Sequence, residues 1–164
     1  MKIRFAETQD VVKILEIVNY EILNSTVIYD YSARTYDYQL NWFEQKKKDN
    51  MPVIVAEDDG VVVGFGSYGI FRAWEAYKFS VEHSIYVSRE ARGKGVGKAL
   101  LTELITLAKA NNFHTMIAGV DASNSGSVAF HKKIGFVEIG IFKEVGYKFD
   151  TWLDLNFMQL MLKD

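Results

Sequence analysis

The period of the hydrophobic positions changes several times along the chain, and each change predicts a new element. Seven segments alternate apolar with polar residues or form short β-branched and aromatic runs, which predicts strands. Four segments repeat apolar residues at intervals of three and four, which predicts helices. The predicted strands cover residues 2–6, 53–57, 61–71, 78–87, 114–121, 136–143 and 151–162. The predicted helices are one capped by Thr8 and those at residues 37–50, 98–112 and 125–135.

The order of these elements indicates a mixed α/β fold in a single domain, residues 1–164. The chain shows no internal repeat, no low-complexity segment and no linker. Asp58-Asp59-Gly60, between two strand patterns, is a strong hairpin signal. The strand, glycine loop, helix and strand between residues 78 and 121 are expected to form a right-handed parallel crossover.

Composition narrows the classes of function. A net charge of −2 argues against a general nucleic-acid binder, which is usually strongly basic. The absence of cysteine excludes disulfides, thiolate metal sites and a cysteine nucleophile, and the three histidines show no metal-ligand spacing, so no metal is expected. The N-terminus lacks a signal-peptide pattern, and no apolar run approaches the roughly 18 residues that span a membrane. These features predict a cytoplasmic protein without a membrane partner.

The most distinctive segment is "SREARGKGVGKALL", residues 88–101. It is not a P-loop, because Arg92 stands where the first glycine belongs and Ala99 stands where Ser or Thr binds the metal. It is not a dinucleotide fingerprint, because its third glycine comes one residue too early. Glycines nevertheless let the backbone approach an anion, and the helix that follows presents its N-terminus to one. On this segment alone, a flexible turn with solvated cations remains the alternative.

A second motif gives the glycine loop a context. Arg92-x-x-Gly95-x-Gly97 resembles the signature of the GNAT superfamily of N-acetyltransferases, whose backbone amides bind the pyrophosphate of acetyl-CoA. Further on, "NSGSVAFHKKIGF" is similar to that superfamily's second pattern, with Asn124 in register and His131 where tyrosine is usual. One predicted helix and one predicted strand separate the two motifs, as in that superfamily.

The similarity narrows to the branch of phosphinothricin and methionine sulfone/sulfoximine acetyltransferases. It runs over nearly the whole chain, including residues 25–31, 77–101 and 144–160. The resemblance implies the GNAT fold, a mixed twisted central sheet flanked by helices. It also implies acetyl-CoA as co-substrate and transfer of acetyl to the α-amine of a small amino acid or analogue, by direct attack on the thioester. Members of this branch usually form homodimers.

The resemblance further implies where the coenzyme binds. The strand that ends at residues 85–87 would pair its backbone with the pantetheine arm, and a backbone N–H there would polarise the thioester carbonyl. The pyrophosphate would lie on the glycine loop. The implied coenzyme-binding residues are Ile85, Tyr86, Val87, Arg92, Gly93, Lys94, Gly95, Val96, Gly97, Lys98 and Asn124.

Two residues are candidates for proton transfer. Glu82, on the strand before the loop, is the candidate general base, acting directly or through a water; the alternative is an exposed strand residue. His131 is the candidate partner of the leaving thiolate, because a histidine can donate a proton near neutral pH. Its alternative is a surface position beside two lysines. His83 follows Glu82 directly, so it faces the other side of a regular strand and is expected to be a hydrogen-bonded core or surface residue.

A carboxylate on the substrate needs a cation, and the aromatic loop at residues 72–77 supplies one. Arg72 has the planar guanidinium that suits a carboxylate. The aromatic residues around it are candidates for the pocket wall, although core packing is the alternative. The candidate substrate-binding residues are Arg72, Trp74, Glu75, Tyr77, Thr26 and Tyr29.

Two other functions remain open. One is acetylation of a protein N-terminus or lysine, against which the aromatic loop argues because it favours a closed, small pocket. The other is a CoA-binding sensor without turnover, which would bind the coenzyme and release no CoA. The apolar last strand, residues 151–162, offers surface for the expected homodimer, although in a sheet it is equally suited to a core.

Overall fold

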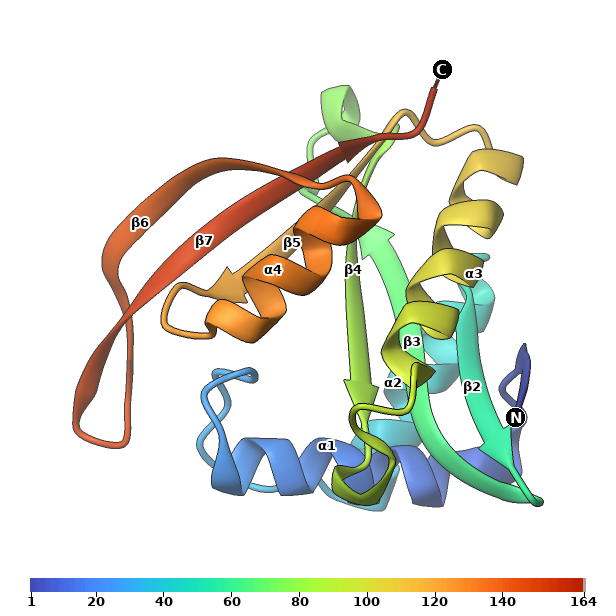
Figure 1. Cartoon of the computed structure of the whole chain (residues 1–164). Helices are drawn as coiled ribbons and strands as arrows, with labels where there is room; N and C mark the ends of the chain where they lie inside the picture. The colour runs from blue at the N-terminus through green and yellow to red at the C-terminus, as the bar shows by residue number, and fades with distance from the viewer. Residues whose placement is uncertain (164) are drawn as a thin grey trace.

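The computed structural model describes residues 1–163 and confirms the predicted mixed α/β architecture (Figure 1). Within these residues, seven strands form one sheet in the order β1-β2-β3-β4-β5-β7-β6. The strands are β1 (Lys2–Phe5), β2 (Val53–Asp58), β3 (Val61–Ile70), β4 (Ser80–Val87), β5 (Thr115–Asp121), β6 (Val137–Lys148) and β7 (Thr151–Met161). The helices are α1 (Val11–Asn24), α2 (Tyr36–Lys48), α3 (Val96–Ala110) and α4 (Ser125–Ile134).

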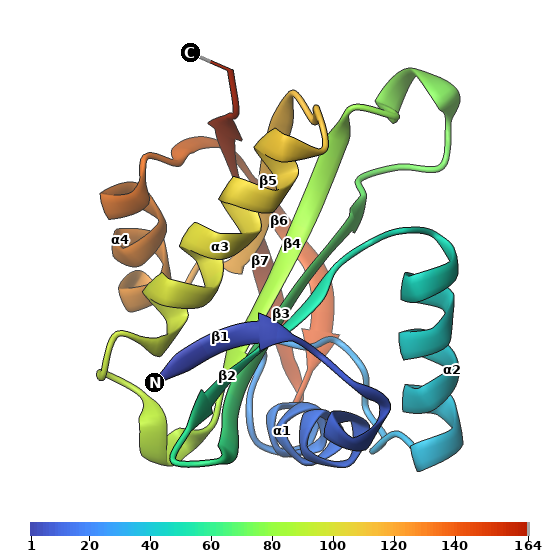
Figure 2. The same ribbon diagram turned by 90° about the vertical axis from the view of Figure 1, so that its right-hand side faces the viewer.

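The helices lie in two layers, with α3 and α4 on one face of the sheet and α1 and α2 on the other (Figure 2). Each layer encloses its own hydrophobic core. The core below α3 includes Leu100, Leu104 and Met116, all fully buried. The core below α1 and α2 includes Ile14 and Phe43. No helix within residues 1–163 is long and apolar enough to cross a membrane.

The parallel pair β4 and β5 separates part-way along its length. The strands pair only from Ser80 opposite Thr115 to Glu82 opposite Ile117. Beyond this point β4 pairs with β3 alone and β5 with β7 alone. The backbone edges that face each other past Glu82 are therefore unpaired with one another, and a cleft opens between them.

Side chains of β4 alternate between the two layers, as a regular strand requires. Val81 and Ile85 pack in the core below α3, and His83 meets α4. Tyr86 packs in the core below α1 and α2. Glu82 and His83 therefore face opposite sides of the sheet, as predicted.

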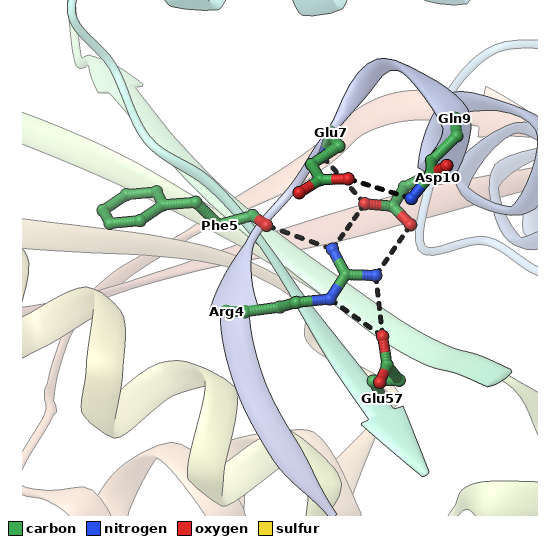
Figure 3. Close-up of polar contacts among 6 residues, drawn as sticks. All are labelled: Arg4, Phe5, Glu7, Gln9, Asp10 and Glu57. Carbon is green, nitrogen blue, oxygen red and sulfur yellow. Dashed lines mark hydrogen bonds and ion pairs between the residues drawn. The ribbon is translucent and has the colours of Figure 1, made fainter. Parts of the chain in front are cut away.

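An arginine network ties the first strand to the start of α1 (Figure 3). The Arg4 guanidinium donates to both carboxylate oxygens of Asp10, at 2.7 and 2.9 Å, and its Nε donates to Glu57 on β2 at 2.8 Å. Asp10 also accepts from the N–H of Glu7 at 2.7 Å. The predicted cap at Thr8 is wrong: Thr8 lies inside a 3₁₀ turn, Thr8–Asp10, whose N-cap is Glu7.

The hairpin of β6 and β7 extends the sheet into an arm (Figure 1). Strand β6 continues to Lys148, past the predicted end at residue 143. The pairing shifts register between Phe142 and Gly146, and Glu144 has a positive φ of 51°. This bulge interrupts the alternation that the sequence pattern relies on, and the strand continues beyond it.

Candidate active site

The cleft between β4 and β5 has a volume of about 740 Å³. Its walls are β4 from His83 to Val87, the end of β5 from Gly119 to Asp121, α4 between Ser127 and His131, and the chain that leaves α1. Thr26, in that last segment, donates a hydrogen bond to Asp121 across the cleft. The separation of two parallel strands thus provides a long slot with unpaired backbone along one side.

The glycine loop lies at the end of β4 and starts α3. Gly93 and Gly95 have φ values of +74° and +83°, and a Cβ atom on either would meet no atom within 4 Å. These glycines are therefore required by backbone conformation rather than by space. Gly95 is the N-cap of α3 and has no side chain to bond the first N–H groups of the helix. A hollow of about 310 Å³ lies over the loop, between Lys98 and Phe130.

Arg92 is engaged within the protein. Its Nη2 forms an ion pair with Glu21, a carboxylate of α1 that is only 4% exposed, and its Nε donates to the carbonyl of Val87. This contact fixes the chain that enters the glycine loop against α1. The exposed cations Lys94 and Lys98 form no ion pair within residues 1–163. The positive charge available to an anion at the loop therefore comes mainly from these two lysines and the helix N-terminus.

Asn124 caps α4 at the far wall of the cleft. Its side-chain Oδ1 accepts a hydrogen bond from the N–H of Ser127 at 3.0 Å. The amide NH₂ stays available to a ligand in the cleft. Asn124, which the second motif requires, is therefore also the N-cap that sets the start of α4.

Glu82 lies half-buried where β4 and β5 separate, and its carboxylate lies beside Gly119 of β5. A Cβ atom on Gly119 would lie 3.1 Å from the Glu82 carboxylate, so the glycine leaves the space that this carboxylate occupies. Burial raises the pKa of Glu82, and the positive charge of Arg72 opposes part of that rise. The result is a carboxylate that can take up a proton more readily than an exposed one.

His131 and His83 form a buried pair at the back of the cleft. Nδ1 of His131 lies 2.8 Å from the Ser127 carbonyl oxygen, so this nitrogen carries the proton and donates. Nε2 of His131 therefore accepts from Nε2–H of His83 at 3.2 Å. Nδ1 of His83 is left buried without a partner among residues 1–163. Burial and the neighbouring ring lower the pKa of His83 to about 3, and burial lowers the pKa of His131.

The six candidate substrate-binding residues do not share one cavity. Arg72, Trp74 and Tyr77 line an apolar hollow of about 500 Å³ against the β6–β7 arm. Glu75 is exposed beside them. Thr26 lines the cleft, whereas Tyr29 packs on Gly146 of the arm. Arg72 is the member of the loop whose charge reaches Glu82.

The sequence interpretation missed a further cavity, of about 130 Å³, between α2 and the face of the sheet that carries Glu82. Gln39 and Lys46 of α2 line it, and neither is marked by the apolar periodicity of this helix. The signal was present in the spacing, because residues 39, 43 and 46 share one face of a helix. Polar residue types at two of these positions concealed it.

Comparisons with known proteins agree with this geometry. The sequence model of the acetyltransferase (GNAT) family matches residues 17–136, most of the chain. The chain belongs to this family. The GNAT fold and an acetyltransferase activity, which the two motifs implied, are thereby confirmed.

Three relatives of this GNAT protein are similar over nearly its whole length. The L-methionine sulfoximine/L-methionine sulfone acetyltransferase of Salmonella typhimurium is 39% identical over 164 residues, which is 100% of this chain and 96% of that protein. An N-acetyltransferase structure from Staphylococcus aureus has a TM-score of 0.98 and 47% identity, covering 99% of this chain and 98% of that one. A phosphinothricin acetyltransferase from Sinorhizobium meliloti, solved with AcCoA, has a TM-score of 0.95 and 38% identity, covering 98% and 87%.

Proposed function

We propose that residues 1–164 form one domain that transfers an acetyl group from acetyl-CoA to the α-amine of a small amino acid or analogue. Methionine sulfone, methionine sulfoximine and phosphinothricin are the proposed acceptors, because relatives similar over nearly the whole chain are named for them. The observation that carries the proposal is the cleft, which has a glycine loop at one end and a half-buried carboxylate where its strands separate.

The residues along the cleft fit acetyl-CoA. The first N–H groups of α3 and the two lysines beside them suit a pyrophosphate, and the unpaired edge of β4 suits an extended arm with amide groups. We assign the pyrophosphate to Gly93–Lys98 and the arm to Ile85–Val87 and Asn124. Arg92 supports the loop through Glu21. When bound, acetyl-CoA supplies the acetyl group as a thioester.

Glu82 is the proposed general base. An amino acid arrives as an ammonium, which has no lone pair until it loses a proton. The raised pKa of Glu82 brings the carboxylate closer to the range in which it exchanges protons at neutral pH. Arg72 is proposed to bind the substrate carboxylate, since its charge reaches the same place.

His131 is proposed to serve the sulfur that leaves. In the neutral pair its Nε2 accepts a hydrogen bond from His83. Both nitrogens of His131 are thus engaged in the neutral pair, Nδ1 with Ser127 and Nε2 with His83. His131 also lines the cleft, and we propose that its Nε2 exchanges the contact with His83 for one with the leaving thiolate, to which it passes the proton that the attacking amine loses.

The test is a panel of amines incubated with acetyl-CoA and the purified protein. We expect CoA release with methionine sulfone or phosphinothricin, and acetylation at the α-amine by mass spectrometry. Release only with peptides would instead identify a protein N-terminal or lysine acetyltransferase. Tight acetyl-CoA binding by calorimetry, with no release on any amine, would identify a CoA-binding sensor.

We also propose that two copies of the chain pair through the β6–β7 arm. Large apolar side chains on this arm are exposed, and an apolar patch of this kind usually marks an interface. They include Ile139 at 61%, Phe142 at 54%, Val145 at 55% and Trp152 at 60%. The cytoplasmic location expected from the sequence stays a prediction.

A further inference from the structure

The cavity below α2, here called the α2 pocket, has no role in the mechanism described above. Its volume of about 130 Å³ is a fraction of that of the cleft. A water molecule occupies about 30 Å³ in the liquid, so the α2 pocket holds a few non-hydrogen atoms. Ser84 and Tyr86 line both the α2 pocket and the cleft, and Glu82 lines the α2 pocket. The two cavities therefore share a wall on the strand that carries the proposed base.

One wall of the α2 pocket holds an unpaired hydrogen-bond donor. Gln39 is 1% exposed, and its Nε2 has no partner among residues 1–163. Its Oε1 accepts a bond from Nη1 of Arg34 at 3.4 Å, and turning the amide over would place two donors together. The NH₂ group is therefore directed away from Arg34. A buried donor of this kind costs free energy unless a ligand or water accepts its hydrogen.

A second donor comes from Lys46. Its ammonium donates to the Tyr68 carbonyl at 2.8 Å and forms no ion pair within residues 1–163, and burial lowers its pKa. Gly69 allows this approach, because a Cβ atom there would lie 2.9 Å from the Lys46 nitrogen. An ammonium has three N–H groups, so two remain for another acceptor.

The other charges around the α2 pocket are accounted for. Arg34 pairs with Asp30 at 2.8 Å, and Glu82, which lines the pocket itself, is the carboxylate proposed to receive the amine proton. Apolar surface comes from Trp42 and Phe65, whose rings pack edge to face with their centroids 6.3 Å apart. The α2 pocket thus combines hydrogen-bond donors on α2 with apolar walls that suit methylene or methyl groups.

We infer that the α2 pocket binds the side-chain tail of the amine substrate, and that Gln39 and Lys46 select tails bearing acceptor oxygens on sulfur or phosphorus. The inference rests on the proposed function and extends it from the α-amine at Glu82 to the other end of the substrate. Sulfonyl, sulfoximine and phosphinyl groups share this chemistry, because their oxygens accept hydrogen bonds and a short methylene chain joins them to the α-carbon. A site built to pair a polar group rejects an analogue that lacks it, since its donors are then left unpaired.

The test compares methionine with methionine sulfone, which differ only in the two sulfone oxygens, and with phosphinothricin as an anionic acceptor. The variants are Gln39→Leu and Lys46→Met. Gln45→Leu and Lys47→Met on the exposed side of α2 are the matched controls. We expect the ratio of kcat/KM for sulfone over methionine to fall by about tenfold in each variant and to stay unchanged in each control. Lys46→Met is expected to lower kcat/KM for phosphinothricin more than for the sulfone, because only the phosphinothricin tail carries a negative charge.

A binding measurement separates this inference from the proposed function. Calorimetry with methionine sulfone and CoA-loaded protein reports the tail contacts without turnover. The wild type could bind methionine sulfone yet turn over no amine, while Gln39→Leu loses that binding. This result would overturn the proposed function and keep the α2 pocket assignment. Turnover of sulfone and methionine at ratios that neither substitution changes would keep the function and overturn the assignment. A Gln39→Leu variant that fails to fold leaves the Lys46→Met ratio to decide.

Discussion

At the scale of single residues, the chemistry of this acetyltransferase depends on what each polar side chain faces. Gly119 leaves room for the Glu82 carboxylate beside β5, and burial there raises the pKa of Glu82. His83, one residue later, faces the opposite layer, where its ring contacts His131 and Phe136. Neighbours in the sequence therefore work in different environments, because β4 alternates its side chains between two cores.

Replacing Glu82 with glutamine tests the base directly. General base catalysis contributes about 10² to 10⁴ in rate, so kcat is expected to fall by that order while acetyl-CoA binding persists. A base acts when ionised, so wild-type activity should be lost as pH falls through the raised pKa of Glu82, and Glu82→Gln should lack this acid limb. Steady-state kinetics across pH measures both. Glu90→Gln, at an exposed glutamate, is the control, and an unchanged acid limb in Glu82→Gln would exclude the assignment.

The buried histidine pair predicts how stability responds to acid. His83 has a folded-state pKa of about 3, well below the value of about 6.5 for a free histidine. Between these values the unfolded chain binds a proton that the folded protein does not, so His83 lowers stability as pH falls, by up to about 1.4 kcal/mol per pH unit. A His83→Phe variant should lose stability less steeply between pH 6 and pH 4.

Urea unfolding at several pH values measures that slope. His114→Asn, at an exposed histidine, is the matched control. Parallel curves for the wild type and His83→Phe would show that His83 accepts a proton in the folded protein. The measurement compares the pH slopes of two variants, so the contributions of the carboxylates that both chains share cancel.

At the scale of elements, the start of α3 carries the binding function of the glycine loop. Gly95 is an N-cap with positive φ and no side chain, so the helix presents its first N–H groups outward. Arg92, which belongs to the same motif, holds the preceding 3₁₀ turn against α1 through Glu21. The motif thus combines one part that leaves donors open with another that fixes the loop in place.

Gly95→Ala is predicted to weaken acetyl-CoA binding. A left-handed φ costs an L-residue roughly 1 to 2 kcal/mol, so the loop should lose stability or change its conformation. We expect the KM for acetyl-CoA to rise by about tenfold, equivalent to 1.4 kcal/mol, with the preference among amines unchanged. Gly60→Ala is the matched control: Gly60 has φ +79° and equally open surroundings in the β2–β3 hairpin. If both variants are destabilised to a similar extent and only Gly95→Ala raises the KM, the glycine loop binds acetyl-CoA. An altered preference among amines would contradict this assignment.

At the scale of the whole molecule, local periodicity predicted the helices and strands but not the cavities between them. Helix α3 was predicted within two residues of its start, because Leu100 and Leu104 repeat on one face. The glycine loop and Asn124 were found from local motifs, and the structure brings both to the cleft. Gln39 was missed because its polar side chain conceals the face of α2 that it shares with Phe43 and Lys46, a face that the helical spacing alone contains. The contact between Arg92 and Glu21 joins residues 71 positions apart and was equally inaccessible.

The arm predicts how the whole molecule assembles. If a second copy covers the exposed apolar face of β6 and β7, the protein should sediment at twice its chain mass of 18.7 kDa. Ile141 is 49% exposed on this arm, and Ile141→Lys would bury a charge in the interface, which costs several kcal/mol. We expect this variant to sediment as a monomer while keeping the helical and sheet content of the wild type by circular dichroism. Val12→Lys introduces the same charge at a 52% exposed residue of α1 and should stay dimeric. A wild type that is monomeric at micromolar concentration would exclude the arm as a stable interface, and the face would then need another partner to cover it.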